Sequence, residues 1–345
     1  MIENYENWEQ EISLTDSHQE LLLIRKTLRR RNYRMILISV MTVVLLILST
    51  IHILIPAAEK LYWDPTVCNY LEDITDLELT MVTYNNLFGH GQHMMMPMIS
   101  KTGFSSYTIE TTFVEWETIN RLTMLSQRKT TLHKGSFQSD SVFWIDMMEG
   151  SFIRECNDNE MLINLTNEDS KQMLSVLPEY IQVLASVTFS RDLSMKQLQM
   201  LMDEHSKSEA RFLWAILRTC DPSEYTDPCG IQLTDYVPNR YQTDYWKNTE
   251  YPNLFPDRGI WSPRSMEQHI ISALRFSADQ VRKGTGILPE GAVPDYYDNV
   301  LNYLANNGIN TYGCYILATP DVLLELMEEG TVSYLYLMDA RIGLK

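Results

Sequence analysis

The sequence has few cysteines and none of the spacings that bind zinc. Its 345 residues include no CxxC pair and only five cysteines, at Cys68, Cys156, Cys220, Cys229 and Cys314. So few and such scattered cysteines exclude a disulfide-rich scaffold, and without a Cys/His cluster a typical zinc site is also excluded. Cys220 and Cys229 flank a Pro-containing loop and can form a disulfide in an oxidising compartment. The sequence leaves the bridged and the reduced state equally open.

Catalytic motifs are also missing. The chain has no GxSxG, HExxH, GxxxxGK[ST] or GxGxxG, and its seven histidines fall in different predicted elements. The soft ligands in residues 90–98, HGQHMMMPM, are compatible with Cu(I), but a contiguous Met run more often fills a core. Glu290, Asp295 and Asp298 lack the alternating pattern of a calcium loop and suit helix capping better. We therefore expect no enzyme, no cofactor and no metal.

Positive charge is scarce outside one short segment. Residues 1–24 carry six carboxylates and residues 25–34 carry six cations, so the net charge of −17 belongs entirely to the remainder. An acidic surface repels nucleic acid and anionic lipid. We expect no direct nucleic-acid contact.

One long run carries no charge at all. Residues 35–55, MILISVMTVVLLILSTIHILI, precede Pro56. At about 1.5 Å of rise per residue, such a helix spans the ~30 Å hydrocarbon core of a bilayer. The sequence therefore predicts one transmembrane helix over residues 35–56. A cleaved signal peptide is disfavoured, because 34 residues precede the run.

Basic residues before this run set the expected orientation. Cations close to a span are retained in the cytoplasm, and they are concentrated on the N-terminal side, at Arg25, Lys26, Arg29, Arg30, Arg31 and Arg34. We expect a single-pass protein of the cell membrane with residues 1–34 in the cytoplasm and residues 57–345 outside.

The predicted cytoplasmic segment has apolar residues at helical spacing. One stripe is formed by Ile2, Tyr5, Trp8 and Ile12; after a capping box at residues 17–20, a second helix carries Leu21, Ile24 and Leu28 on one face. Thirty-four residues cannot bury these groups in a core of their own. The segment either lies on the bilayer or docks a cytoplasmic protein, with Trp8 as anchor. The acidic first helix favours docking.

The predicted exterior consists of two regions that differ in sequence composition and pattern. Residues 57–165 contain β-rich runs such as LELTMVTYNN, SSYTIETTFVEW and SVFWIDMM, which predict a membrane-proximal β-rich region. In residues 166–345 helices and strands alternate and end in a strand–helix–strand unit, TYGCYILAT, DVLLELMEEG and TVSYLYLMD, which predicts an α/β part. The expected exterior is α+β overall.

The C-terminal half resembles a known family through a series of features in order over about residues 170–340. They are Leu174, Leu177-Pro178, Phe189, Phe212-Leu213-Trp214-Ala215, Tyr251-Pro252, Ala273-Leu274-Arg275-Phe276, YLANNGI at 303–309, Tyr312-Gly313, Thr319-Pro320 and Leu323-Leu324. This series resembles the sigma-factor regulator family of membrane-bound anti-sigma factors, which restrain extracytoplasmic-function sigma factors in Firmicutes. The cytoplasmic segment here is shorter than is usual for that family, and it lacks the His/Cys zinc motif of another anti-sigma class.

The resemblance implies a regulator that holds an extracytoplasmic-function sigma factor at the membrane, through Ile2, Tyr5, Trp8, Ile12, Leu21, Ile24 and Leu28, and reports the state of the cell envelope. Release by proteolysis and release by conformational change both stay open. The alternative is a membrane-anchored binding module for an envelope polymer or a second membrane protein, with a passive cytoplasmic tail. An anchored hydrolase ranks third, because no site for it can be assembled.

Overall fold

The structure is a computed structural model, and the chain divides into two compact units, Met1–Tyr62 and Trp63–Lys345. The residues it describes are 3–70, 74–95, 97–119, 121–134, 136–137, 167–205, 210–222, 228–234, 249–254, 262–283 and 294–342. Side chains of residues 3–22 lie outside this description.

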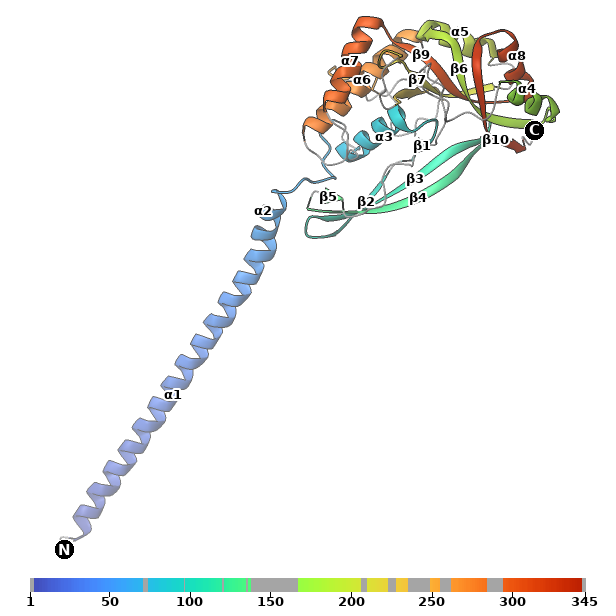
Figure 1. Cartoon of the computed structure of the whole chain (residues 1–345). Coiled ribbons are helices and arrows are strands. Elements are labelled where there is room, and N and C mark those ends of the chain that lie inside the picture. Colours follow the sequence, from blue (N-terminus) through green and yellow to red (C-terminus); the bar gives the residue numbers. More distant parts are fainter. Residues whose placement is uncertain are drawn as a thin grey trace. The chain divides into compact units, whose positions relative to one another are not determined.

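The first unit is helical from Glu3 to Glu59. Helix α1 (Glu3–Ser49) leads through a π-helical turn η1 (Thr50–Leu54) into α2 (Ile55–Glu59) (Figure 1). Pro56 explains the turn, because proline lacks an N–H and its ring clashes with the carbonyl four residues earlier. The backbone relaxes by letting the Ile55 N–H reach back to the Thr50 carbonyl. The predicted start of a second helix near Ser17 is wrong, since α1 continues through it.

One helix in the described part of the chain is long and apolar enough to cross a membrane. It covers Leu23–Glu59, with a hydropathy of 2.6 in its most apolar window. Thr42 and Thr50 donate their hydroxyls to the carbonyls of Ile38 and Leu46 at 2.9 and 2.8 Å, which satisfies their polar groups within the helix. The length and composition are those of a single membrane anchor.

A five-stranded antiparallel sheet organises the second unit, in the order β10-β6-β9-β7-β8. Its strands are β6 (Ile181–Ser194), β7 (Ala210–Leu217), β8 (Gly230–Gln232), β9 (Asn310–Ala318) and β10 (Val332–Ile342). Helix α5 (Met195–His205) joins β6 to β7, and α8 (Pro320–Glu328) joins β9 to β10. Because each helix connects strands that have one strand between them, the unit has the split βαβ topology of a ferredoxin-like fold.

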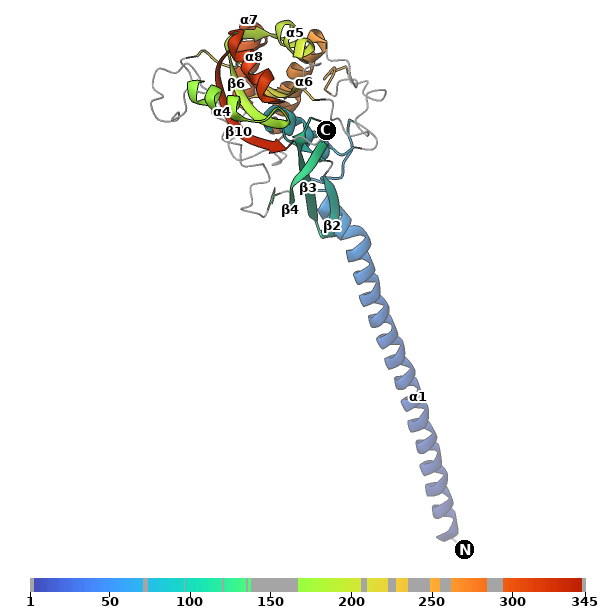
Figure 2. The same cartoon turned by 90° about the vertical axis from the view of Figure 1, so that its right-hand side faces the viewer.

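Helices cover one face of this sheet. They are α4 (Asn167–Val176), α5, α6 (Pro263–Arg282), α7 (Pro294–Asn307) and α8 (Figures 1 and 2). On β6 the odd-numbered Val183, Val187 and Phe189 belong to the large core beneath the helices, whereas Leu184 belongs to a smaller cluster on the opposite face. Asn167 also blocks the β10 edge, because its amide bonds the Ser333 carbonyl and the Leu335 N–H.

A second, smaller sheet contains a long hairpin. Its strands are β1 (His93–Met94), β2 (Met98–Gly103), β3 (Ser106–Thr118), β4 (Arg121–His133) and β5 (Ser136–Phe137). In β3 the side chains alternate, and Tyr107, Ile109, Thr111 and Phe113 are buried. The predicted strand in SSYTIETTFVEW is confirmed. SVFWIDMM, residues 141–148, lies outside the described residues.

The predicted strand LELTMVTYNN is wrong. It forms helix α3 (Asp76–Phe88), which begins with a capping box: Thr75 Oγ1 accepts from the Glu78 N–H at 3.1 Å, and the Glu78 carboxylate accepts from the Thr75 N–H at 2.9 Å. Nearly all of α3 is buried, and it packs against α6 and β8. This part of the expected membrane-proximal region is therefore built into the same unit as the C-terminal half, and the predicted boundary at residue 165 lies outside the described residues.

The elements of the C-terminal half agree with those predicted from the sequence. TYGCYILAT, DVLLELMEEG and TVSYLYLMD are β9, α8 and β10, with Thr319 and Pro320 at the start of α8. Gly308 and Gly330 take φ angles of 77° and 74° just beyond α7 and α8, where glycine allows each helix to end. Helix α6 begins at Pro263, with Ser262 as its N-cap.

Candidate functional site

The predicted docking residues lie along one continuous helix. Ile2 precedes the described residues, and the others belong to α1. A straight α-helix turns about 100° per residue, so positions sixteen apart are related by about 160°. This relation holds for three pairs, Tyr5 with Leu21, Trp8 with Ile24, and Ile12 with Leu28. The two apolar sets are therefore placed on opposite sides of α1 and cannot enter the same groove.

The end of this segment nearest the apolar run presents both apolar and charged groups. Ile24 and Leu28 are 54% and 51% exposed. The six cations predicted to set topology, Arg25, Lys26, Arg29, Arg30, Arg31 and Arg34, form no ion pair with any described residue. The Arg29 guanidinium lies 5.9 Å from the centre of the Tyr33 ring. These side chains remain available to a partner or to lipid headgroups.

A buried polar cluster ties the segment before β3 to the large sheet. Trp116 Nε1 donates to His93 Nε2 at 3.1 Å, and the Thr234 hydroxyl lies 2.9 Å from the same nitrogen. The Arg211 guanidinium stacks 3.9 Å from the centre of the Trp116 ring. Burial, and then the charge of Arg211, lower the pKa of His93 to about 3. His93 is therefore neutral at physiological pH and acts as a hydrogen-bond acceptor.

Arg341 joins the hairpin to the sheet in the same region. It donates to the Trp116 carbonyl at 2.7 Å and to Glu115 at 3.0 Å, and the side chains of Arg341 and Glu115 are only 16% and 14% exposed. Ile119 N also donates to Gln182 at 2.8 Å. These contacts fix how the hairpin lies on the second face of the sheet, beside the small cluster around Trp214.

The methionines of the Met-rich stretch, residues 90–98, lie in different environments in the structure. Met94 is 3% exposed and belongs to the core, whereas Met98 is 67% exposed; Met96 lies outside the described residues. His93 already uses Nε2 with Trp116 and Thr234. The described ligand atoms are thus divided between the core and the surface, which supports the packing interpretation over copper. In the described part of the chain, no group of three His, Cys, Asp or Glu side chains is close enough to hold a metal.

The two candidate disulfide partners are not bridged. Cys220 and Cys229 are both buried and carry thiols. Cys229 is hydrogen-bonded to Tyr296, and burial raises its pKa to about 12. A thiol that stays protonated is a poor nucleophile for disulfide exchange. Of the two states that the sequence left open, the structure therefore contains the reduced one.

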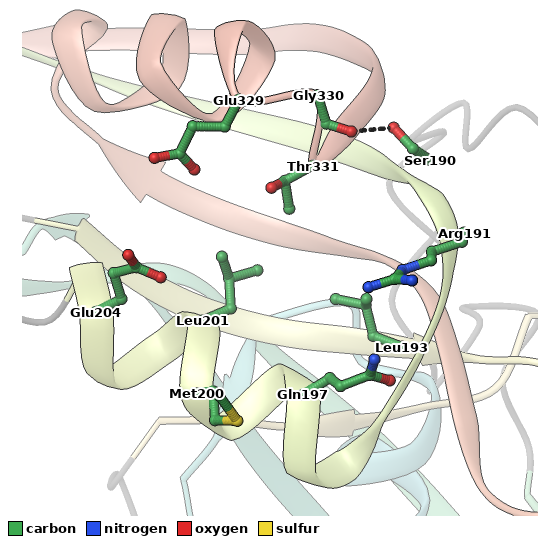
Figure 3. Close-up of a pocket in the computed structure, with 10 residues that line it drawn as sticks. All are labelled: Ser190, Arg191, Leu193, Gln197, Met200, Leu201, Glu204, Glu329, Gly330 and Thr331. Atoms are coloured by element: carbon green, nitrogen blue, oxygen red, sulfur yellow. Dashed lines mark hydrogen bonds between the residues drawn. The ribbon is translucent and has the colours of Figure 1, made fainter.

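A groove that the sequence did not predict lies between α5 and the turn from α8 to β10. We call it the α5 groove; it has a volume of about 490 Å³ and is lined by Ser190, Arg191, Leu193, Gln197, Met200, Leu201, Glu204, Glu329, Gly330 and Thr331 (Figure 3). Ser190 Oγ donates to the Gly330 carbonyl at 2.6 Å and closes one end. The spacing of Gln197, Met200, Leu201 and Glu204 could have indicated one face of a helix, but no local signal places that face beside the α8–β10 turn.

Comparison with known proteins gives a match to a protein family. Residues 174–338 fit the family model described as "Sigma factor regulator C-terminal". This range begins in α4 and includes all of the large sheet except the last residues of β10. It corresponds to the predicted resemblance over about residues 170–340. Neither a curated protein nor a solved structure matches the chain.

Proposed function

We propose that this chain, whose residues 174–338 match the family model of the sigma factor regulator C-terminal domain, is a membrane-anchored anti-sigma factor without enzymatic activity. Residues 1–34 would hold an extracytoplasmic-function sigma factor at the cytoplasmic face and deny it to RNA polymerase. The Trp63–Lys345 unit would sense the state of the envelope. The observation that carries the proposal is the family match on a chain that also has one exposed, membrane-length helix.

The charge distribution supports the proposed orientation. Six cations precede the apolar part of α1, and Lys60 is the only Lys or Arg between Pro56 and residue 100. A cytoplasmic N-terminus places the docking residues where sigma factors work. It also places the large acidic unit outside, away from nucleic acid.

The continuous helix suggests how a short segment could mask a larger protein. With apolar residues on opposite sides, α1 would be contacted from two directions at once. A sigma factor that closes around it with two surfaces would bury both sets, and both surfaces would become unavailable to polymerase or promoter DNA. Buried aromatic and aliphatic anchors commonly carry most of the binding energy at such interfaces.

Truncating one anchor from each set should abolish capture of the sigma factor. In a Trp8→Ala, Leu21→Ala double variant, each loss is expected to cost about 2 kcal/mol, or roughly 30-fold in affinity. The assay is binding of a sigma factor encoded beside this gene to the full chain in nanodiscs. An Asn7→Ala, His18→Ala variant, changed between the two apolar sets, should bind like the parent. Equal binding by the parent and the anchor variant would sink the docking assignment.

An insertion tests whether the two sides of α1 act together. Two alanines after Thr15 rotate Leu21, Ile24 and Leu28 by about 200°, which brings them to the same side as Tyr5 and Trp8. We expect affinity to fall at least tenfold. The same insertion between Arg34 and Met35 leaves both sets in place and should change affinity less than twofold. If both insertions are tolerated, the continuous helix is not the form that binds.

One observation favours a second role, an anchored exterior binding module. The α5 groove is lined by charged side chains that form no ion pair with any described residue. Deletion of residues 1–34 separates the two functions. Unchanged sigma-dependent transcription after this deletion, with a cell-surface phenotype that still needs the exterior, would favour the binding module.

A further inference from the structure

We propose that the α5 groove binds a short extended peptide of about three residues, with its ammonium group beside Glu204 and Glu329 and its carboxylate beside Arg191. The groove contains opposite charges at its two ends and apolar side chains between them, and this order is the one that such a peptide would match.

Two carboxylates define one end. Glu204 projects from α5 and Glu329 from the end of α8, so that they approach the same space from opposite walls (Figure 3). Neither forms an ion pair or a side-chain hydrogen bond with any described residue. Two unpaired carboxylates at the same end of the groove repel each other unless a cation lies between them. An ammonium group supplies the charge and three donors.

Donors define the other end. Arg191 directs its guanidinium toward Leu193 and Gln197 (Figure 3), and it forms no ion pair within the described residues. Gln197 Oε1 accepts from the backbone N–H and the hydroxyl of Ser194, both at 3.0 Å. Because its oxygen is already used, Gln197 offers its amide N–H groups. A guanidinium and an amide N–H together suit a carboxylate.

The length of α5 fixes the size of the ligand. Gln197 and Glu204 are seven residues apart on one helix face, which corresponds to about 10 Å at 1.5 Å per residue. An extended peptide covers about 3.3 Å per residue. Three residues therefore separate an ammonium from a carboxylate by the distance between the two ends. A free amino acid, whose two charges share one carbon, could reach only one end.

The middle of the groove is apolar. Leu193 and Leu201 are 7% and 8% exposed and form its floor, and Met200, 61% exposed, stands at its side. A methionine side chain adapts to ligands of different shape. An aliphatic central residue in the peptide would cover this floor. The binding itself is independent of the proposed function; only its use as an envelope signal rests on that proposal.

Methionine-methyl NMR of the full chain in nanodiscs tests the site. The probe is Ala-Leu-Ala with free ends, and the Met200→Leu variant identifies the Met200 signal. We expect Ala-Leu-Ala to shift the Met200 signal saturably. N-acetylation or C-terminal amidation of the peptide should each weaken binding about fivefold or more. A Met200 signal that does not respond to 10 mM peptide, against a domain whose other methionine signals are intact, overturns the proposal.

Charge-removing variants assign the two ends. In a Glu204→Gln, Glu329→Gln variant, N-acetylation should no longer matter, whereas amidation should still weaken binding; Arg191→Gln should show the reverse. Glu328→Gln and Lys196→Gln change exposed charges beside the groove and should keep the parental pattern. If all variants lose affinity equally for all three peptides, the ends are not recognised and the assignment fails. Sigma-factor binding by these variants should be unchanged, which separates this test from that of the proposed function.

Discussion

A Gly230→Ala substitution is expected to destabilise the Trp63–Lys345 unit by about 3–5 kcal/mol, a large fraction of the stability of an ordinary domain. A Cβ at this position would overlap Cζ2 and Cε2 of Trp214 and the carbonyl oxygen of Ala215. Trp214 is fully buried, and its Nε1 donates to the Asn86 carbonyl at 3.2 Å, so the ring cannot withdraw without losing that bond. Ala215 cannot move without disturbing β7, which pairs with both β8 and β9.

Denaturant unfolding of the full chain, followed by tryptophan fluorescence, measures the effect. Gly103→Ala is the matched control, because a Cβ there meets Ser106 only at an ordinary 3.8 Å. It should change the free energy of unfolding by less than about 1 kcal/mol. Similar losses in the two variants would show that the close approach of β8 to Trp214 is not what requires glycine.

The same unit should lose stability on acidification between pH 6.5 and about pH 4. Burial lowers the pKa of His93 to about 3 and that of His269 to about 4, from a usual value of 6.5. His269 Nδ1 donates to the Asn253 carbonyl at 3.0 Å, and the side chain is buried. In this pH range the unfolded chain binds protons that the folded chain does not. The stabilisation is therefore complete above the unfolded-state pKa of 6.5 and decreases as the pH falls from there to the folded-state values.

From pH 7 to pH 5, each of these histidines should reduce the free energy of unfolding by roughly 2 kcal/mol. Denaturant unfolding at pH 5, 6 and 7 gives the slope. Replacing His93 or His269 with glutamine should each remove about one proton from the linkage near pH 5.5, and the double variant about two. A slope that both single variants leave unchanged would assign the acid sensitivity to other groups.

Sequence reasoning succeeded where the signal was local and periodic. The alternation in β3 and the final strand–helix–strand unit of β9, α8 and β10 could both be predicted from neighbouring residues. The order of strands in the large sheet could not be predicted. The sequence of β9, α8 and β10 indicates a strand–helix–strand unit, but it does not indicate which other strand lies between β9 and β10 in the sheet. That strand, β6, precedes β9 by a long stretch of chain.

Helix α3 shows how a local signal can be misread. Its Thr, Val and Tyr residues favour a strand, but Thr75 and Glu78 form a capping box that was present in the sequence. Tertiary burial decided the outcome, since a helix buried on almost every side gains from β-branched and aromatic residues as a strand does. The capping box was the better predictor, and hydrophobic texture the poorer one.

The candidate sites show the same difference between local signals, which the sequence contains, and long-range contacts, which it does not reveal. The docking residues were predicted by helical spacing, but their placement on opposite sides of the helix depends on α1 being unbroken at Ser17. The α5 groove and the Arg341–Glu115 pair are made by residues far apart in the chain. No periodicity links such residues, so only the folded arrangement reveals them.

The strand order has a consequence for how the protein is made. The β6 strand must wait for partners from the far end of the chain, since Val183 pairs with Ala318 and Ile181 with Ile342. Synthesis runs from the N-terminus, so α1 is complete long before β10 leaves the ribosome. Pairings this distant in sequence form slowly. With the proposed topology, a newly made molecule would already have its membrane helix and its proposed docking segment while its large sheet is still incomplete.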